Sequence, residues 1–211
     1  MEQNNNYYSQ ERPEMLAFLP ADFKTVLDLG CGAGFFSASI KKRFPAVNIW
    51  GVERDERSAA QAKEKLDKVY CSDLLEAIDD LPDNFFDVIV CNDILEHLAD
   101  PFSLIIKLKQ KLSSGGRIIS SIPNVRYLPN LKKLLIDKQW RYEDEGILDR
   151  THLRFFTAKS IKDMFVQAGY QIETFKGINA INSWKFNLLN IISLGYLSDT
   201  RYLQFACVVK L

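Results

Sequence analysis

The stretch VLDLGCGAG, residues 26–34, decides the fold of this chain of 211 residues. It begins within a short apolar run, residues 24–29, which is typical of a buried strand. Three glycines at alternate positions follow, and glycine lets the backbone pass close to a ligand where any Cβ would clash. Residues 35–44 then show the apolar spacing of a helix and a basic end that suits a helix C-terminus. A strand, a glycine turn and a helix in this order favour a nucleotide-binding unit.

Strand-like and helix-like hydrophobic periods alternate along most of the remaining chain. Further strands are expected at residues 47–52, 68–71, 86–91, 116–122, 171–178 and 202–209. Further helices are expected at residues 56–66, 101–112 and 157–168. This alternation with short loops predicts a single α/β domain, residues 1–211, with a doubly wound, mostly parallel sheet and helices on both faces.

Two insertions interrupt this rhythm, and we expect them to form a helical lid over the substrate. Residues 124–154 combine an amphipathic helical pattern with a polar stretch that contains aromatic side chains. These aromatic side chains either stack on a sugar or another ring, or form the small core of the lid itself. Residues 179–200 are rich in apolar side chains. They either cover the substrate pocket, form a homodimer contact or lie on a membrane surface.

The composition disfavours several classes of partner and site. Lys+Arg and Asp+Glu number 27 each, and a formal net charge of zero gives no drive toward nucleic acid. The four cysteines lack the close spacing of a zinc or redox motif, so buried free thiols and no metal site are expected. No secretory signal opens the chain, and no apolar stretch reaches the roughly 20 residues of a membrane span. The expectation is a cytoplasmic protein without a transmembrane segment.

Two acidic residues around the glycine turn indicate which ligand it binds. Asp28 precedes Gly30 by two residues, where it would repel a pyrophosphate but favour the amino group of an amino-acid ligand. Glu53 ends the second expected strand, nineteen residues after Gly34. A carboxylate there can accept two hydrogen bonds from a ribose diol, although it could also be a solvated strand end.

The end of the third expected strand completes the pattern. Asp73 can accept a hydrogen bond from the exocyclic amine of adenine while Leu74 packs on the ring, although Asp73 could equally cap a following helix. An amino-acid end, a ribose and an adenine, recognised in that order by adjacent strands, indicate S-adenosylmethionine.

The motifs in residues 26–34, 51–55, 72–74 and 86–92 resemble, in this order, those of the class I (Rossmann-like) methyltransferases. The resemblance runs from residue 7 to the end of the chain. It implies a sheet of seven strands whose last strand is antiparallel and lies between the fifth and the sixth. It also implies contacts to the cofactor from a set of residues near the strand ends: Asp28, Gly30, Cys31, Gly32, Gly34, Glu53, Arg54, Asp73, Leu74 and Asn92.

A narrower resemblance rests on DILEHL (residues 93–98), SIPNV (residues 121–125) and GILDRTHLRFFT (residues 146–157). These stretches are similar to a group of bacterial small-molecule methyltransferases that accompany glycosyltransferases of surface-polysaccharide pathways. The resemblance implies a small-molecule acceptor, with a sugar or a glycan-linked group as one form. Tyr8 and Arg12 would either close over the amino-acid end of the cofactor or belong to an ordinary flexible terminus.

Methyl transfer to a hydroxyl group, the favoured reaction, requires positioning of the acceptor and removal of its proton. His97 and His152 both fall near expected carboxyl ends of strands, and a histidine with a pKa near its ordinary ~6.5 accepts a proton at neutral pH. Either histidine could instead fix a loop through a hydrogen bond to the backbone. The charged residues 149–154 either bind substrate hydroxyls or anchor the first insertion by ion pairs.

Two other functions compete with this interpretation. A nicotinamide-dependent oxidoreductase would need the spacing GxGxxG, which is absent, and Asp28 argues against it. A non-catalytic module that binds S-adenosylmethionine, or a partner subunit, would keep the glycine turn and Glu53 but would not need the two histidines.

Overall fold

A computed structural model describes residues 11–211 of the chain and contains one sheet of seven strands. The strands are β1 (Thr25–Leu29), β2 (Asn48–Glu53), β3 (Lys68–Cys71), β4 (Phe86–Asn92), β5 (Leu112–Pro123), β6 (Gln171–Ala180) and β7 (Tyr202–Lys210). Their order is β3-β2-β1-β4-β5-β7-β6. Strand β7 is antiparallel to both of its neighbours, and the other pairs are parallel. The predicted fold class and the place of the last strand are confirmed.

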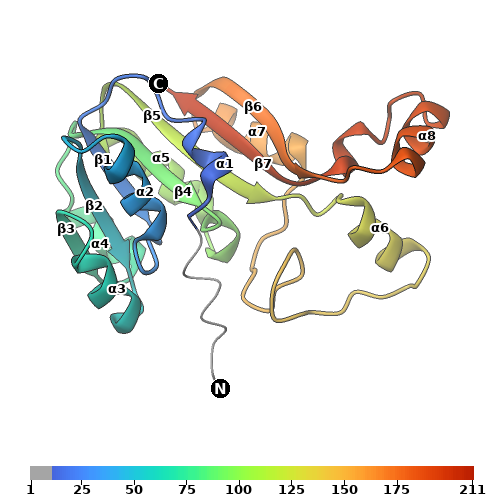
Figure 1. The fold of residues 1–211 in the computed structure, drawn as a ribbon, viewed down its shortest axis with the longest axis horizontal. Coiled ribbons are helices and arrows are strands. Elements are labelled where there is room, and N and C mark those ends of the chain that lie inside the picture. Colours follow the sequence, from blue (N-terminus) through green and yellow to red (C-terminus); the bar gives the residue numbers. More distant parts are fainter. Residues whose placement is uncertain (1–10) are drawn as a thin grey trace.

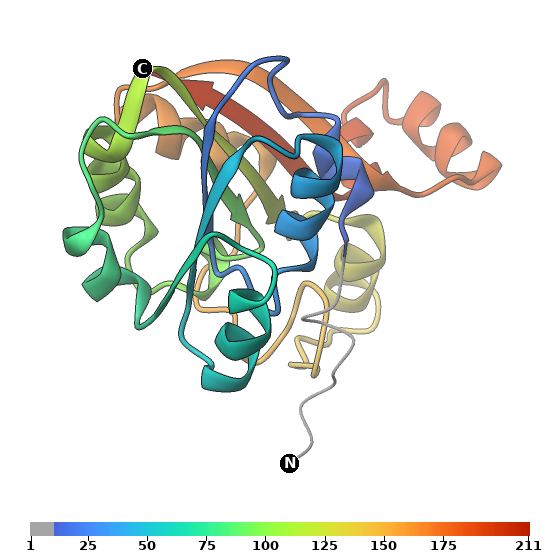
Figure 2. The ribbon, with the colours of Figure 1, turned by 60° about the vertical axis from the view of Figure 1, so that its left-hand side comes forward.

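Helices cover both faces of the sheet (Figures 1 and 2). They are α1 (Pro13–Leu16), α2 (Phe35–Arg43), α3 (Glu56–Lys63), α4 (Leu74–Asp80), α5 (Pro101–Lys111), α6 (Leu128–Leu135), α7 (Ala158–Gln167) and α8 (Trp184–Ile192), with short 3-10 helices η2 (Leu95–His97) and η3 (Ser198–Arg201). One core cluster joins the sheet to α4, α5 and α7, and the other joins it to α1, α2 and α3.

The central strand β4 shows why two cores form. Val88 and Val90 pack in one cluster, whereas Ile89 and Cys91 pack in the other. Successive side chains of a strand point to opposite faces, so a continuous apolar run serves both layers of helices. The same arrangement brings the carboxyl ends of β1, β2, β3, β4 and β5 to one edge of the sheet, where ligands of such folds bind.

The insertions leave the sheet at this edge and beside it. Helix α6 confirms the amphipathic pattern of the first insertion, and residues 136–156 continue from it alongside the strand ends (Figure 1). Helix α8 of the second insertion projects away from the sheet (Figure 1) and leaves Trp184, Ile191 and Ile192 at least 70% exposed. None of the helices within residues 11–211 is long and apolar enough to cross a bilayer. The lid and homodimer interpretations stay predictions.

Candidate functional site

The glycine turn after β1 requires glycine for two reasons. Gly30 has a φ of +69°, in the left-handed region that other residues rarely adopt. A Cβ added to it would lie only 2.7 Å from Cδ1 of Ile94, in the segment that follows β4. The turn therefore passes close to the end of β4, and Gly34 is the N-cap of helix α2 directly after it.

We expect the substitution Gly30→Ala to lower the free energy of unfolding by about 2–4 kcal/mol, because left-handed strain and overpacking against Ile94 add together. Gly115→Ala is the matched control, since Gly115 has a φ of +77° but nothing within 4 Å of an added Cβ. It should lose only the strain, about 1–2 kcal/mol. Urea denaturation of both variants measures the difference, and equal losses would show that the contact with Ile94 is unimportant.

Asp28 is a buried carboxyl beneath the glycine turn. Its side chain is 3% exposed and accepts a hydrogen bond of 2.6 Å from the hydroxyl of Ser37. Burial raises the pKa of Asp28 to about 7, and the hydrogen bond from Ser37 only partly offsets this. A buried carboxyl with one neutral partner is suited to a cationic ligand group, because a cation would favour its charged form.

Glu53, at the end of β2, is tied to the glycine turn. One carboxylate oxygen accepts a hydrogen bond of 2.9 Å from the backbone N–H of Gly32, and the other accepts one of 2.8 Å from the N–H of Asp55. The residue is 7% exposed, so it is not a solvated strand end. Each oxygen keeps a second lone pair with which it can accept a bond from a ligand hydroxyl.

Asp73 caps a helix that our assignment of helices omitted. Its side chain accepts a hydrogen bond of 2.9 Å from the N–H of Leu75 at the start of α4, so the capping interpretation is confirmed. Leu74 is 7% exposed and packs in the core.

Cys31 is also buried, and burial raises the pKa of its thiol, which makes it a poor nucleophile. Arg54 is exposed beside Glu53.

Asn92, at the end of β4, has an amide that is available for a ligand contact. Both polar atoms of its amide are buried, and neither has a hydrogen-bond partner among the described residues. Buried polar groups in proteins are almost always satisfied, so this amide is a natural contact for a molecule bound at the strand ends.

A second part of the site is a pocket of about 630 Å³ on the other side of the β4 end. Its walls come from the N-terminal segment, the β4 end, the first insertion and the ends of β6 and β7. Six acidic side chains line it: Glu11, Glu14, Asp93, Glu96, Glu145 and Asp149. Arg12 is the one Lys or Arg side chain among the lining residues. The pocket is therefore acidic and accessible to polar molecules.

Arg12 holds the N-terminal segment onto the strand ends. Its guanidinium pairs with Asp93, donates a bond of 3.1 Å to the hydroxyl of Ser121 and reaches Gln204 at 3.3 Å. The residue is 9% exposed, so the flexible-terminus interpretation is wrong for this position. Tyr8, the other residue predicted from this segment, lies outside the described residues.

His152 lines the pocket and packs against His97, although the two histidines are 55 positions apart in the sequence. Their ring centroids lie 4.7 Å apart in an edge-to-face arrangement. Nδ1 of His152 donates a hydrogen bond of 2.9 Å to the carbonyl of Ile147, so Nε2 of the neutral ring is an acceptor. Nδ1 of His97 lies 3.3 Å from the carbonyl oxygen of Thr151, and burial lowers the pKa of His97. Both rings thus also stabilise loops.

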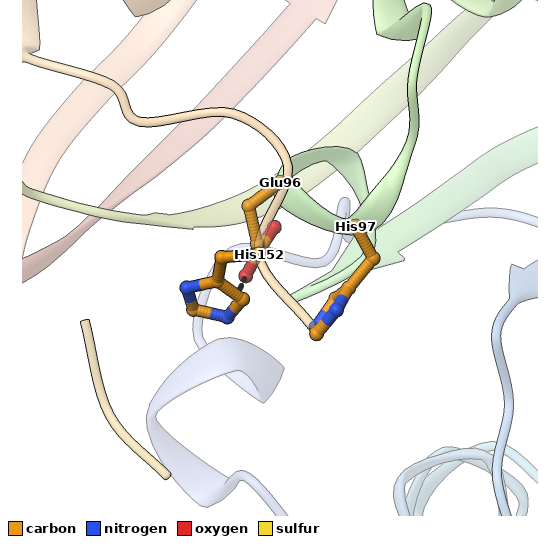
Figure 3. A group of neighbouring side chains, drawn as sticks. All are labelled: Glu96, His97 and His152. Carbon is orange, nitrogen blue, oxygen red and sulfur yellow. Dashed lines mark ion pairs between the residues drawn. The ribbon is translucent and has the colours of Figure 1, made fainter. Parts of the chain in front are cut away.

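Glu96 lies between the histidines (Figure 3). It was not among the site residues predicted from the sequence. It is 1% exposed, and neither carboxylate oxygen has a hydrogen bond within the described part of the chain. Its Oε1 lies 4.0 Å from Nε2 of His152, and burial raises its pKa to about 8. The sequence does contain a signal: an acidic residue stands directly before His97, after the apolar pair Ile94 and Leu95.

Backbone contacts hold the two parts of this cluster together. The N–H groups of Leu153 and Arg154 both donate to the carbonyl of Glu96, at 2.8 and 3.0 Å. The guanidinium of Arg154 also donates to the carbonyl of Ala99. The insertion is thus anchored by hydrogen bonds to backbone carbonyls rather than by the expected ion pairs. The rings of Trp140 and Tyr142 contact Phe155 but remain exposed.

Comparisons with known proteins agree with this geometry. Residues 1–174 match a family model described as "Methyltransferase domain". The ubiquinone biosynthesis O-methyltransferase of Nitrosomonas europaea is 32% identical over 106 residues, which are 48% of this chain and 44% of that protein. The protein of the same name from Hydrogenovibrio crunogenus is 29% identical over 169 residues, 77% of this chain and 68% of that protein. The match to the first relative thus spans less than half of its length.

The fold also matches solved structures. A SAM-dependent methyltransferase from Archaeoglobus fulgidus superposes with a TM-score of 0.67 at 22% sequence identity, covering 94% of this chain and 91% of that one. At this level of identity the likeness establishes the shared fold.

Proposed function

Because the chain belongs to the family of methyltransferase domains, we propose that it transfers the methyl group of S-adenosylmethionine to a hydroxyl oxygen of a small molecule. Family membership favours an enzyme over a non-catalytic module and rules out the nicotinamide-dependent alternative. The observation that carries the choice of site is the cluster of Glu96, His97 and His152, of which Glu96 and His152 line the acidic pocket just after the strand end that carries Asn92. We call these three residues the EHH cluster.

The described residues fit S-adenosylmethionine, which supplies an electrophilic methyl group when bound. A Cβ added at Gly30 or Gly34 would clash with neighbouring side chains, which keeps the turn as glycine, and the amide of Asn92 offers two unused hydrogen-bonding atoms. In this proposal Asp28 accepts from the amino group of the ligand, Glu53 from its ribose hydroxyls and the remaining oxygen of Asp73 from its adenine. Gly30, Gly32 and Gly34 provide the close backbone approach, with Cys31, Arg54 and Leu74 around them.

The choice of an oxygen acceptor is supported by the pocket and by the relatives. A pocket lined by the His152 imidazole and by several carboxyl groups suits removal of a proton from a hydroxyl group. The two relatives compared above are named O-methyltransferases, and their names identify a small-molecule pathway. An acceptor linked to a surface polysaccharide draws no support from them, so sugars enter the test as one class of acceptor among several.

The direct test is transfer of a labelled methyl group from S-adenosylmethionine by the purified chain. The panel should contain phenols, carboxylic acids and free or phosphorylated sugars, with matched amines and thiols. Calorimetry with S-adenosylhomocysteine and with NAD, run in parallel, measures ligand binding alone. We expect micromolar binding of the first and none of the second, and label on an oxygen. Label on amines or thiols only would contradict the choice of acceptor, and binding with no transfer would favour a non-catalytic module.

The substitution His152→Asn separates a chemical from a structural role of this histidine. The Asn amide N–H can still donate to the carbonyl of Ile147, whereas the acceptor Nε2 is lost. We expect kcat to fall about 100-fold, the typical size of a lost acid–base contribution, with cofactor affinity unchanged. Retained activity would show that His152 only fixes its loop, and thermal unfolding checks that the variant folds.

A further inference from the structure

We propose that the EHH cluster is a binding site for a divalent metal ion. Glu96 and His97 come from the short helix η2 after β4, and His152 comes from the first insertion. One ligand atom from each residue can be chosen so that all three lie within 4.8 Å of one another. Figure 3 shows the three side chains converging on one region. The absence of a metal motif among the cysteines led to the opposite expectation.

The donor set decides the kind of ion. One carboxylate and two imidazoles are the ligands that Zn²⁺ and other first-row divalent metals such as Mn²⁺ accept readily, whereas Ca²⁺ and Mg²⁺ prefer oxygen alone. Bonds of about 2.1 Å to one ion place its ligand atoms about 3–3.5 Å apart. The observed spread of up to 4.8 Å requires only small side-chain rotations to reach that arrangement.

Glu96 provides an independent sign of a bound cation. Its carboxyl is 1% exposed, and both oxygens lack any hydrogen bond among the described residues. Burying a carboxylate without hydrogen bonds is strongly unfavourable, and such groups in proteins are normally paired with a cation or coordinate a metal. The one cationic partner within 4.0 Å among the described residues is His152, itself a member of the cluster. The nearest guanidinium of the pocket, that of Arg12, is already used by Asp93 and Glu14.

The surroundings of His152 resemble the outer shell of a metal site. Metal-binding histidines usually donate their other ring N–H to a carbonyl or carboxylate, which fixes the ring and makes the ligand nitrogen an acceptor. The bond from Nδ1 of His152 to the carbonyl of Ile147 does this. The acidic lining of the pocket adds a negative potential that concentrates cations near the cluster.

The role of the ion rests on the proposed function, whereas the site itself does not. A metal-bound hydroxyl group loses its proton more easily, because the ion stabilises the alkoxide. The alkoxide oxygen then forms a bond to the methyl carbon as the carbon–sulfur bond breaks and the sulfonium becomes a neutral thioether. In this arrangement Nε2 of His152 binds the ion and does not accept the proton, which goes to solvent, so charge and atoms balance without any further reactant.

Metal binding is tested first, without cofactor or acceptor. The full chain, stripped with a chelator, is titrated with Mn²⁺ followed by electron paramagnetic resonance and with Zn²⁺ followed by calorimetry. We expect one site per chain with a micromolar Kd. Glu96→Gln, which keeps the shape of the side chain, and His152→Asn should each weaken binding at least 30-fold. Asp144→Asn is the matched control, since it removes one charge from an exposed side chain of the same insertion, and it should change Kd less than twofold.

The outcomes are distinct. No binding of either ion at 1 mM, or equal weakening by Glu96→Gln and Asp144→Asn, would overturn the site. Thermal unfolding confirms that each variant folds, and His152→Asn keeps the test valid if Glu96→Gln does not. Labelled methyl transfer with and without the chelator then tests the role. If the chelator does not change the rate of methyl transfer, the ion has no role in the reaction, although the binding site still stands. If the chain binds metal but transfers no methyl group, the result contradicts the proposed function and not the metal site.

Discussion

The substitution Asp28→Asn will weaken S-adenosylmethionine binding about 10- to 100-fold and will stabilise the cofactor-free chain at pH 8. The loss of affinity follows from removing a charged hydrogen-bond acceptor, which contributes about 1.5–3 kcal/mol. The gain in stability follows from the burial of Asp28, since the neutral amide keeps its neighbour Ser37 but carries no charge into the core.

The sign and size of the gain depend on the raised pKa of Asp28. The carboxyl ionises near its ordinary 3.8 in the unfolded chain and near 7 in the folded chain. The folded state therefore binds the proton more tightly, and stability is lost as the pH rises from about 4 to about 7. Three pKa units correspond to a penalty on the order of 3–4 kcal/mol above pH 7. Asp28→Asn removes this penalty at pH 8 but gains only about 1 kcal/mol at pH 4.5.

Thermal unfolding of the cofactor-free protein at the two pH values measures the gain, which should appear at pH 8 as a rise of roughly 6–12 °C in Tm. Asp87→Asn is the control of opposite sign. Burial raises the pKa of Asp87, but hydrogen bonds from Ser113, Lys24 and Thr25 outweigh it and leave the pKa below its ordinary value. This control should therefore lower Tm at pH 8. A Tm of Asp28→Asn equal to that of the original chain at pH 8, with unchanged cofactor binding, would contradict both parts of the prediction.

The substitution Arg12→Met should lower the free energy of unfolding by about 3–5 kcal/mol and reduce kcat/KM. It leaves Asp93 without its cation in a pocket wall, and removing one partner of a buried pair costs this much. It also releases the N-terminal segment from Ser121 and Gln204, which opens the pocket. Urea denaturation and the labelled methyl assay measure the two effects.

Two controls define this result. The double variant Arg12→Met/Asp93→Asn should recover about half of the lost stability, because it removes the uncompensated charge. Arg150→Met breaks an exposed ion pair, in which the side chain of Arg150 is 59% exposed and that of Asp144 is 92% exposed. It should lower the free energy of unfolding by less than about 0.5 kcal/mol. If Arg12→Met costs no more than Arg150→Met, the guanidinium does not hold the segment in place.

The strands and the main helices could be predicted from the sequence because an α/β domain with helices on both faces of its sheet repeats simple hydrophobic periods. The observed ends of some elements differ from the predicted ends where a cap or a strand pairing sets the boundary. Helix α4 was omitted because its seven residues are too few for a clear period, and the cap at Asp73 establishes its start. Strand β5 begins at Leu112 rather than at 116, because residue 112 pairs with Phe86 before the register shifts.

The sequence by itself determined the cofactor turn, because its parts lie in one continuous stretch and at the ends of successive strands. The acid at Asp28 and the glycines from Gly30 act through local backbone conformation, which local sequence controls. Only the tertiary structure decided which proposed catalytic and metal-binding side chains come together beside that turn. It brought His152 from an insertion to His97, and it placed between them Glu96, whose carboxylate oxygens make no hydrogen bond within the described residues. It also paired Arg12 with Asp93. The two histidines are 55 positions apart in the sequence, and Arg12 and Asp93 are 81 positions apart. No hydrophobic period predicts contacts over such separations, because these contacts depend on how the insertion and the N-terminal segment pack against the strand ends.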